Sequence, residues 1–348
     1  MISTLYNAIK AGKNGANKGI PTGLPKLDSL TYGIQRKWMT VIAGDSGSGK
    51  SSLALYYSVY KPFCTYMDTK GTINAIDIKF LLFSFELASD VLLAKLLSTY
   101  IFEYYGRVIS YSDILSLQNT LSDDDYNLIL TAKPWLEEFE RICEVIDKPV
   151  TAKGLYAICK EWSRKYGDYE ETVTPNGYIK ETYKPKNPQQ FLIVLVDHIK
   201  LLTTDSGNTS KQEIDKACDF LIGFRNKCSF TIYIVQQLNR TFKSMARRGN
   251  DGLYSLLQLD DLADSSGPGN AAEVVIGIFF PFREKLSKCE GYDIKILRDR
   301  MRLVQILKQR FGMSDRSVGC TFFGEVGLWN ELPLPNEIQD YTQYVKLI

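Results

Sequence analysis

The sequence predicts an α/β fold with a mostly parallel, twisted sheet flanked by helices. Short apolar runs that fit buried strands alternate along the chain with longer amphipathic segments that fit helices. Two of the runs end in a carboxylate, Glu86 and Asp197. Ligands bind at the carboxyl ends of the strands in such sheets, so these two acidic residues are candidates for a functional site.

The first predicted strand, within residues 39–44, leads into the pattern Gly44-x-x-x-x-Gly49-Lys50-Ser51 and then an apolar helix start. In this P-loop pattern, backbone N–H groups surround a phosphate, the lysine faces the β- and γ-phosphates, and the hydroxyl can bind Mg²⁺. A glycine-rich turn could match by chance, but the flanking strand and helix favour binding of ATP, or another NTP, with Mg²⁺. The predicted nucleotide-binding residues are Gly44, Asp45, Ser46, Gly47, Ser48, Gly49, Lys50, Ser51 and Ser52.

Bulk composition narrows the class of protein only slightly. The 348 residues allow one large domain or two smaller ones, and a net charge of +2 neither requires nor excludes nucleic acid. The seven cysteines form no Cys-x-x-Cys pair and His198 is the only histidine, which favours reduced thiols over a zinc site or disulfides. Without an apolar signal segment or an 18-residue apolar run, we expect a soluble cytoplasmic protein that makes no membrane contact.

Further elements follow from periodicity and turn signals. An Asn-Gly pair between two β-prone arms predicts a hairpin at residues 169–183, and residues 61–80, with Gly71 among polar residues, are predicted to form a hairpin or loop. The other predicted strands are 79–85, 191–197, 230–235, 274–280, 301–307 and 318–323, and the predicted helices are 89–105, 122–147 divided near Pro134, 153–166 and 211–227.

The N-terminus predicts a short amphipathic helix over residues 1–11, followed by a Gly/Asn/Lys-rich linker at residues 12–19. An isolated helix of this length is marginal in water, so its apolar stripe should dock on a surface. That surface could belong to the same chain or to a neighbouring subunit.

Five short motifs, in order, resemble those of the RecA-like motor domain of DnaB-type replicative helicases, over about residues 18–330. Each is weak alone, but together and in this order they are specific. They are a lead-in at Pro21–Asp28, Ser84-Phe-Glu86-Leu, a Walker B segment at Val196–Leu202, Gln236-Gln237-Leu-Asn-Arg240, and Lys308-Gln-Arg310-Phe-Gly312.

The resemblance implies a role for each matching residue. Lys50 and Ser51 would hold the phosphates and Mg²⁺, and Asp197 would hold the metal's water shell. Glu86 would activate the attacking water, and Gln237 would sense the γ-phosphate. The remaining catalytic pair, which would reach into a neighbouring subunit's site, is Lys308 and Arg310. Phosphoryl transfer independently calls for such a carboxylate and cation.

The resemblance also implies a ring-forming DNA helicase, expected to be a hexamer, that moves on single-stranded DNA during replication with a primase or a helicase loader as a partner. The basic loop with Lys243, Arg247 and Arg248 would contact DNA phosphates, although it could be only a solvated charged segment. The alternative function is a RecA-like ATPase that acts as a loader, recombination mediator or assembly switch without unwinding.

The chain departs from the family pattern in several places. Residues 261–266 lack the family's arginine, and the acidic run that follows is replaced by residues 267–273. The predicted organisation is an N-terminal arm at 1–19, a motor domain at 20–332 with an insertion at about 167–190, and a C-terminal tail at 333–348. A compact motor of this kind suits a phage replisome, which would place it in the host cytoplasm. His198 is expected to be structural, since hydrolysis requires no base at its position.

Overall fold

The computed structural model describes residues 2–13, 15, 17–174, 176–239, 256–262 and 267–347. In this part of the chain, a nine-stranded sheet has the order β13-β12-β11-β8-β1-β7-β6-β2-β3. Strands β3 to β8 in this order pair in parallel, and β11, β12 and β13 add an antiparallel edge, so the predicted mostly parallel sheet is confirmed. The strands are β1 (Met39–Gly44), β2 (Ile78–Ser84), β3 (Cys143–Ile146), β6 (Phe191–Asp197), β7 (Thr231–Gln237), β8 (Val274–Phe279), β11 (Met301–Gln309), β12 (Arg316–Phe323) and β13 (Leu328–Glu331).

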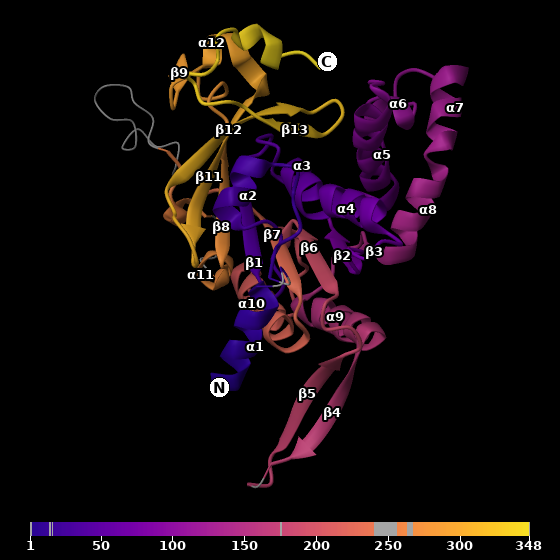
Figure 1. The fold of residues 1–348 in the computed structure, drawn as a ribbon, viewed down its shortest axis with the longest axis vertical. Helices are drawn as coiled ribbons and strands as arrows, with labels where there is room; N and C mark the ends of the chain where they lie inside the picture. The colour runs from indigo at the N-terminus through magenta and orange to yellow at the C-terminus, as the bar shows by residue number, and fades with distance from the viewer. Residues whose placement is uncertain are drawn as a thin grey trace.

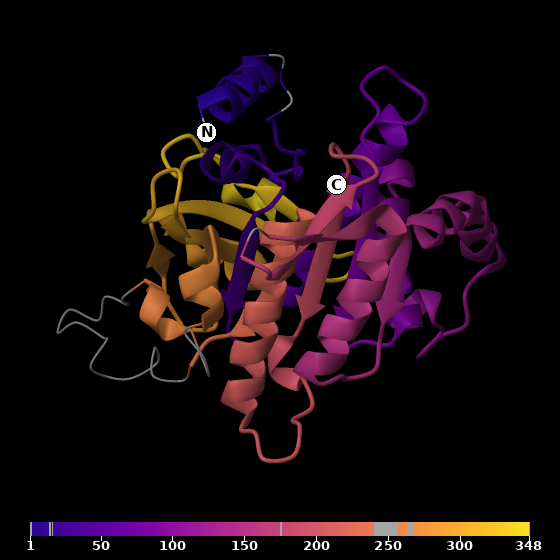
Figure 2. The same cartoon turned by 90° about the horizontal axis from the view of Figure 1, so that it is seen from below.

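Helices cover both faces of the sheet, as Figures 1 and 2 show. Alternate residues of the strands therefore enter two separate apolar cores: in β1, Ile42 joins one and Val41 the other. One face is covered by α3 (Lys50–Leu55), the π-helical turn η1 (Tyr56–Tyr60), α4 (Lys61–Thr69), α5 (Ser89–Tyr105) and α8 (Lys133–Ile142), and the other by α9 (Ala152–Tyr166) and α10 (Ser210–Cys228).

Shorter elements connect and extend these layers. They are α2 (Pro25–Thr31), α6 (Tyr111–Ile114), α7 (Asp123–Thr131), η2 (Ile199–Leu201), η5 (Leu259–Asp261), α11 (Gly267–Ala271), β9 (Lys288–Cys289), β10 (Tyr292–Asp293), α12 (Ile294–Leu297), η6 (Arg298–Arg300) and η7 (Tyr341–Tyr344).

The register of the parallel strands gathers several candidate residues at one edge of the sheet. Gly44 at the end of β1 pairs with Gln237 at the end of β7, and Ser84 at the end of β2 pairs with Asp197 at the end of β6. This carboxyl edge is where the P-loop begins. The sheet topology, rather than closeness in sequence, therefore assembles the candidate site.

Two local predictions were wrong. Residues 61–69 form helix α4 rather than a hairpin or loop, because Phe63 and Tyr66 are buried against the sheet. The predicted helical segment 122–147 ends earlier, and its last part forms the edge strand β3 beside β2. In both places tertiary packing decides a segment whose local pattern was ambiguous.

The predicted hairpin is confirmed as β4 (Gly167–Val173) and β5 (Ile179–Pro185), which project from the body of the molecule in Figure 1. Its base is fixed to α9: the Tyr183 hydroxyl donates to the Ser163 carbonyl at 3.0 Å. Its far end is exposed, with Val173 and Tyr178 each 74% accessible. The hairpin is therefore anchored at one end only.

The N-terminal helix α1 (Ile2–Lys13) presents an exposed apolar stripe of Ile2, Leu5, Tyr6 and Ile9. The structure thus does not place this stripe on the chain's own core, and docking on a neighbouring subunit stays a prediction. At the other end of the chain, Ile338 is buried in the core.

All seven cysteines are free thiols. Among the residues that the structure describes, no helix has the length and apolar character needed to cross a membrane.

Candidate active site

The P-loop has the backbone geometry that its glycines allow. Gly49 precedes α3 with φ of 95°, a left-handed conformation that other residues rarely adopt. A Cβ atom on Gly49 would lie 2.9 Å from the Trp329 ring and 3.3 Å from the Phe322 ring. These two rings are stacked on each other and support the loop from β12 and β13. The position is thus restricted to glycine by both conformation and space.

Ser51 and Asp197 meet at the carboxyl edge of the sheet. The Ser51 hydroxyl donates to Asp197 Oδ1 at 3.1 Å, although the residues are 146 positions apart. Burial and the negative charge of Glu86 raise the pKa of Asp197 to about 6, against the lowering effects of Ser51 and Lys50. Lys50 is itself buried, at 8% exposure. A lysine, a hydroxyl and a carboxylate therefore converge where a phosphate and its metal would sit.

Glu86 is presented at the same edge by a turn that follows β2. The Ser84 hydroxyl donates to the Leu87 carbonyl at 2.7 Å, and the Phe85 N–H donates to the Asp197 carbonyl at 2.8 Å. These bonds direct the chain away from the sheet, and Glu86 is exposed. It is close enough to Asp197 to raise the pKa of that carboxyl.

Gln237 and His198 form the adjacent part of the edge. Their side chains are hydrogen-bonded to each other, and His198 Nδ1 also accepts from the Lys200 N–H at 3.2 Å. Burial and the charge of Lys50 lower the pKa of His198. The histidine thus connects Gln237 to the Walker B segment, which agrees with the structural role expected for it.

Two arginines that the sequence analysis missed bind the P-loop backbone. Arg302, buried in β11, donates from Nε to the Ser48 carbonyl at 2.7 Å and lies 3.5 Å from the centre of the Phe280 ring. Arg283 donates to the Ser46 carbonyl and lies 3.6 Å from Asp45. A single arginine inside an otherwise apolar predicted strand was the available signal for Arg302.

Lys95 is a third residue that the sequence analysis missed. It lies on α5, with Nζ 4.1 Å from the centre of the Tyr111 ring. Burial lowers the pKa of Lys95, while the charges of Asp197 and Glu86 act in the opposite direction. A second lysine of the same chain is therefore electrostatically coupled to the two candidate carboxylates.

Lys308 and Arg310 lie at the opposite edge of the sheet. Gln309 of β11 pairs with Val274, which pairs with Thr40 near the start of β1, whereas the P-loop follows the end of β1. The six residues of β1 span roughly 17 Å. Of the sequence-predicted residues, the structure thus brings together the P-loop, Glu86, Asp197 and Gln237, and separates Lys308 and Arg310 from them.

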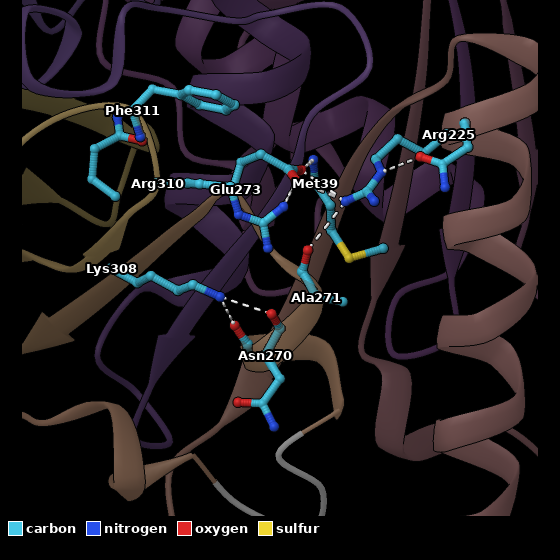
Figure 3. Close-up of polar contacts among 11 residues, drawn as sticks. Met39, Arg225, Asn270, Ala271, Glu273, Lys308, Arg310 and Phe311 are labelled. Atoms are coloured by element: carbon cyan, nitrogen blue, oxygen red, sulfur yellow. Dashed lines mark hydrogen bonds and ion pairs between the residues drawn. The ribbon is translucent and has the colours of Figure 1, made fainter.

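The separated pair is held by contacts within its own chain, as Figure 3 shows. Lys308 Nζ donates to the carbonyls of Gly269 and Asn270 at 2.9 and 2.8 Å, and Arg310 Nη1 lies 2.7 Å from Glu273 Oε1. Burial and the charge of Arg310 lower the pKa of Lys308.

Comparison with known proteins agrees with this geometry. Residues 19–102, which include the P-loop and Glu86, match the family model of the DnaB-like helicase C terminal domain. Two solved structures superpose on 95% of the chain, each with a TM-score of 0.68 and 19% identity. They are an ATPase domain of a DnaB-like replicative helicase, of which 97% is covered, and a second DnaB-like replicative helicase described with its interactions with primase, of which 68% is covered.

The chain carries a RecA-like domain of the DnaB helicase type. DnaB-type helicases are ATP-hydrolysing, and the P-loop with its converging carboxylates is the corresponding part of this chain. The hairpin β4–β5 interrupts this DnaB-type domain between α9 and β6.

Part of the DnaB-type site lies outside the described residues. The predicted DNA-binding residues Lys243, Arg247 and Arg248 fall there, as do residues 263–266 of the altered motif. The chain enters the undescribed segment after Asn239, whose N–H donates to the Asp261 carbonyl at 2.8 Å. That bond lies just beyond the end of β7, on the nucleotide side of the sheet.

Proposed function

We propose that the protein is a ring-forming helicase motor that hydrolyses ATP, or another NTP, between subunits and moves along single-stranded DNA. The observation that carries this proposal is the separation of the P-loop from Lys308 and Arg310. A cation that serves a P-loop from the far edge of the same sheet has to serve the P-loop of another copy. Such head-to-tail contacts generate rings when the rotation closes.

On this proposal, one subunit supplies the binding half of each site. The P-loop amides and Lys50 hold the phosphates, and Glu86, exposed beside Asp197, orients the attacking water and accepts its proton. Gln237, held by His198, is placed to report the presence of the γ-phosphate to β7 and the segment that follows it. A backbone-bound P-loop, fixed by Arg302, keeps these groups in register.

The donor set of this half fits Mg²⁺. The Ser51 hydroxyl and the Asp197 carboxylate are hard oxygen donors that already face each other at 3.1 Å. Ser51 would hold the ion directly and Asp197 through its water shell. When bound, Mg²⁺ would neutralise charge that develops on the phosphate oxygens.

A neighbouring subunit supplies the other half. Arg310, 45% exposed, is the side chain best placed to reach outward and stabilise negative charge in the transition state, with Lys308 beside it. We propose a ring of six copies, and the exposed stripe of α1 as a contact between them. A contact with primase or with a loader is a further part of the proposal, supported by the neighbour described with primase.

The DNA contact is assigned to Lys243, Arg247 and Arg248, which follow β7 in the chain. A strand end that touches the γ-phosphate sensor and leads to the DNA-binding segment would couple hydrolysis to movement. Contacts with phosphates would be independent of DNA sequence and sensitive to salt.

The test combines three measurements on the full chain: ATPase activity with and without single-stranded DNA, unwinding of a forked duplex, and mass by light scattering with and without nucleotide. We expect DNA to stimulate turnover, forks to open only with hydrolysable nucleotide, and the mass to correspond to an oligomer. An oligomer that hydrolyses ATP but neither responds to DNA nor opens forks would contradict the helicase proposal.

A further inference from the structure

Glu273 lies at the centre of a buried cluster that ends at Arg310. The residue is 4% exposed and follows α11 at the start of β8. Its carboxylate accepts from Arg310 Nη1 at 2.7 Å, from Arg225 Nη1 at 2.9 Å and from the Met39 N–H at 2.7 Å. Figure 3 shows these side chains converging from separate elements of the fold. A buried carboxylate with three donors is held in one orientation.

The anchors of this carboxylate are rigid parts of the domain. Arg225 lies on α10, is 12% exposed, and also donates to the Ala271 carbonyl at 3.1 Å. Met39 begins the central strand β1, and its carbonyl accepts from the Glu273 N–H at 2.9 Å. Glu273 is therefore fixed to two elements before Arg310 is considered.

The backbone at Arg310 is fixed without the help of the carboxylate. The Arg310 N–H donates to the Glu273 carbonyl at 2.9 Å, and the next side chain, Phe311, stacks on Trp38 with ring centres 5.0 Å apart. What the carboxylate adds is the direction of the guanidinium. It binds Nη1, while a guanidinium has five N–H donors in a planar fork.

We propose that Glu273 is the positioning residue of the trans-acting Arg310, an inference that rests on the proposed function. The carboxylate holds one side of the guanidinium, and the exposed side is presented to the phosphate of the adjacent subunit. Preorganised donors stabilise a transition state without reorganising during the reaction. Arg225 keeps the buried carboxylate paired when Arg310 shifts toward the phosphate, which avoids leaving an unpaired buried charge.

The informative variant is Glu273→Gln, because it keeps the shape of the side chain. Oε1 faces two arginines and Oε2 faces Arg225 and an N–H, so an amide nitrogen at either position would meet a donor. We expect kcat for ATP hydrolysis to fall at least about 10-fold with KM within about 3-fold, the pattern of a transition-state contact. In the double variant with Arg310→Ala, Glu273→Gln should slow turnover less than about 2-fold further, because its effect passes through Arg310.

Mixing inactive subunits separates this role from damage to the fold. Glu273→Gln keeps a native P-loop, and Lys50→Ala keeps a native Glu273 and Arg310. In an equimolar mixed ring, about a quarter of the interfaces would combine the two native halves. We therefore expect the mixture to hydrolyse ATP at least about 5-fold faster than the sum of the separate proteins. Arg310→Ala mixed with Lys50→Ala is the reference and should recover in the same way.

Glu138→Gln serves as the matched control. Glu138 also pairs with two cations, Arg141 and Lys70, but lies on α8 away from the nucleotide edge. It should alter thermal stability without changing kcat, whereas an equal loss of kcat would mean that any lost ion pair impairs the enzyme and would overturn the proposal.

The remaining outcomes are separable. Recovery of the Arg310→Ala mixture without recovery of the Glu273→Gln mixture would overturn the role of Glu273 and leave the proposed function intact. Wild-type kcat in Glu273→Gln, or an undiminished effect in the Arg310→Ala background, would also overturn it. Recovery in neither mixture would overturn the trans-acting arginine and this inference together.

Discussion

The Ser51 hydroxyl donates a hydrogen bond to Asp197 Oδ1 over 3.1 Å, which joins the first turn of α3 to the end of β6. The bond places the two residues proposed to hold Mg²⁺ within reach of one ion. Lys50 lies close enough to Asp197 to lower the pKa of its carboxyl against the effect of burial. The phosphate-binding and metal-binding parts are thus one connected unit.

Removing the hydroxyl should weaken the metal dependence of turnover. We expect Ser51→Ala to require at least about 10-fold more Mg²⁺ for half-maximal ATPase activity, because one of two protein oxygens is lost. A Mg²⁺ titration of the ATPase rate measures this. Ser58→Ala is the control, since the Ser58 hydroxyl donates only to the Ala54 carbonyl in the same helix region, at 2.7 Å. An unchanged titration for Ser51→Ala would contradict the assignment.

Glu86→Gln should separate binding from hydrolysis. The amide keeps the size of the side chain but cannot accept the proton of the attacking water, so we expect turnover to fall about 10²-fold or more. Binding of a fluorescent nucleotide should stay within about 3-fold of wild type, since the P-loop is untouched. Asp90→Asn, at an exposed site four residues along the chain, should keep normal turnover. Retained turnover in Glu86→Gln would mean that another group positions the water.

Gly49→Ala should disable the P-loop. The added methyl would require a left-handed backbone and would lie 2.9 Å from the Trp329 ring, which is packed against Phe322. We expect nucleotide binding to be lost and thermal stability to fall, both measured by thermal unfolding with and without ATP. Gly71→Ala is the comparison, because Gly71 also has positive φ but has no atoms within 4 Å of the added carbon. It should show only a loss of stability, with the stabilisation by ATP retained.

The far end of the hairpin should be dispensable for the ATPase site. Replacing residues 172–180 with Asn-Gly keeps Glu181, which binds Lys160 at 2.7 Å, and the anchored Tyr183. Because Val173, Tyr178 and the other removed side chains are largely exposed, we expect unchanged thermal stability and basal ATPase activity. A large loss of either would show that this end of the hairpin contributes to the fold or to the interface that completes the site.

The fold was predictable wherever strands are continuously apolar, as at 191–197 and 274–280, because burial on both faces leaves a clear pattern. Helix α4 was missed because aromatic and threonine residues are weak helix formers, and its packing decides its structure. β3 was missed because four partly buried residues after a helix carry little signal.

The site was predictable where motif and strand end coincide, as at Lys50 and Asp197. Arg302 and Lys95 could not be found in this way, because their positions depend on how β11 returns beside β8 and how α5 packs over the P-loop side. The role proposed for Glu273 likewise depends on the convergence of three elements that are distant in the chain.

The central claim is that each active site is completed by a second copy of the chain. The most direct test is ATP turnover per subunit as the protein is diluted, with the mass of the species measured at every concentration. We expect turnover to fall together with the oligomer, and Arg310→Ala to be slow, by about 10³-fold, at all concentrations. Full turnover by a monomer that carries Arg310→Ala would contradict the account.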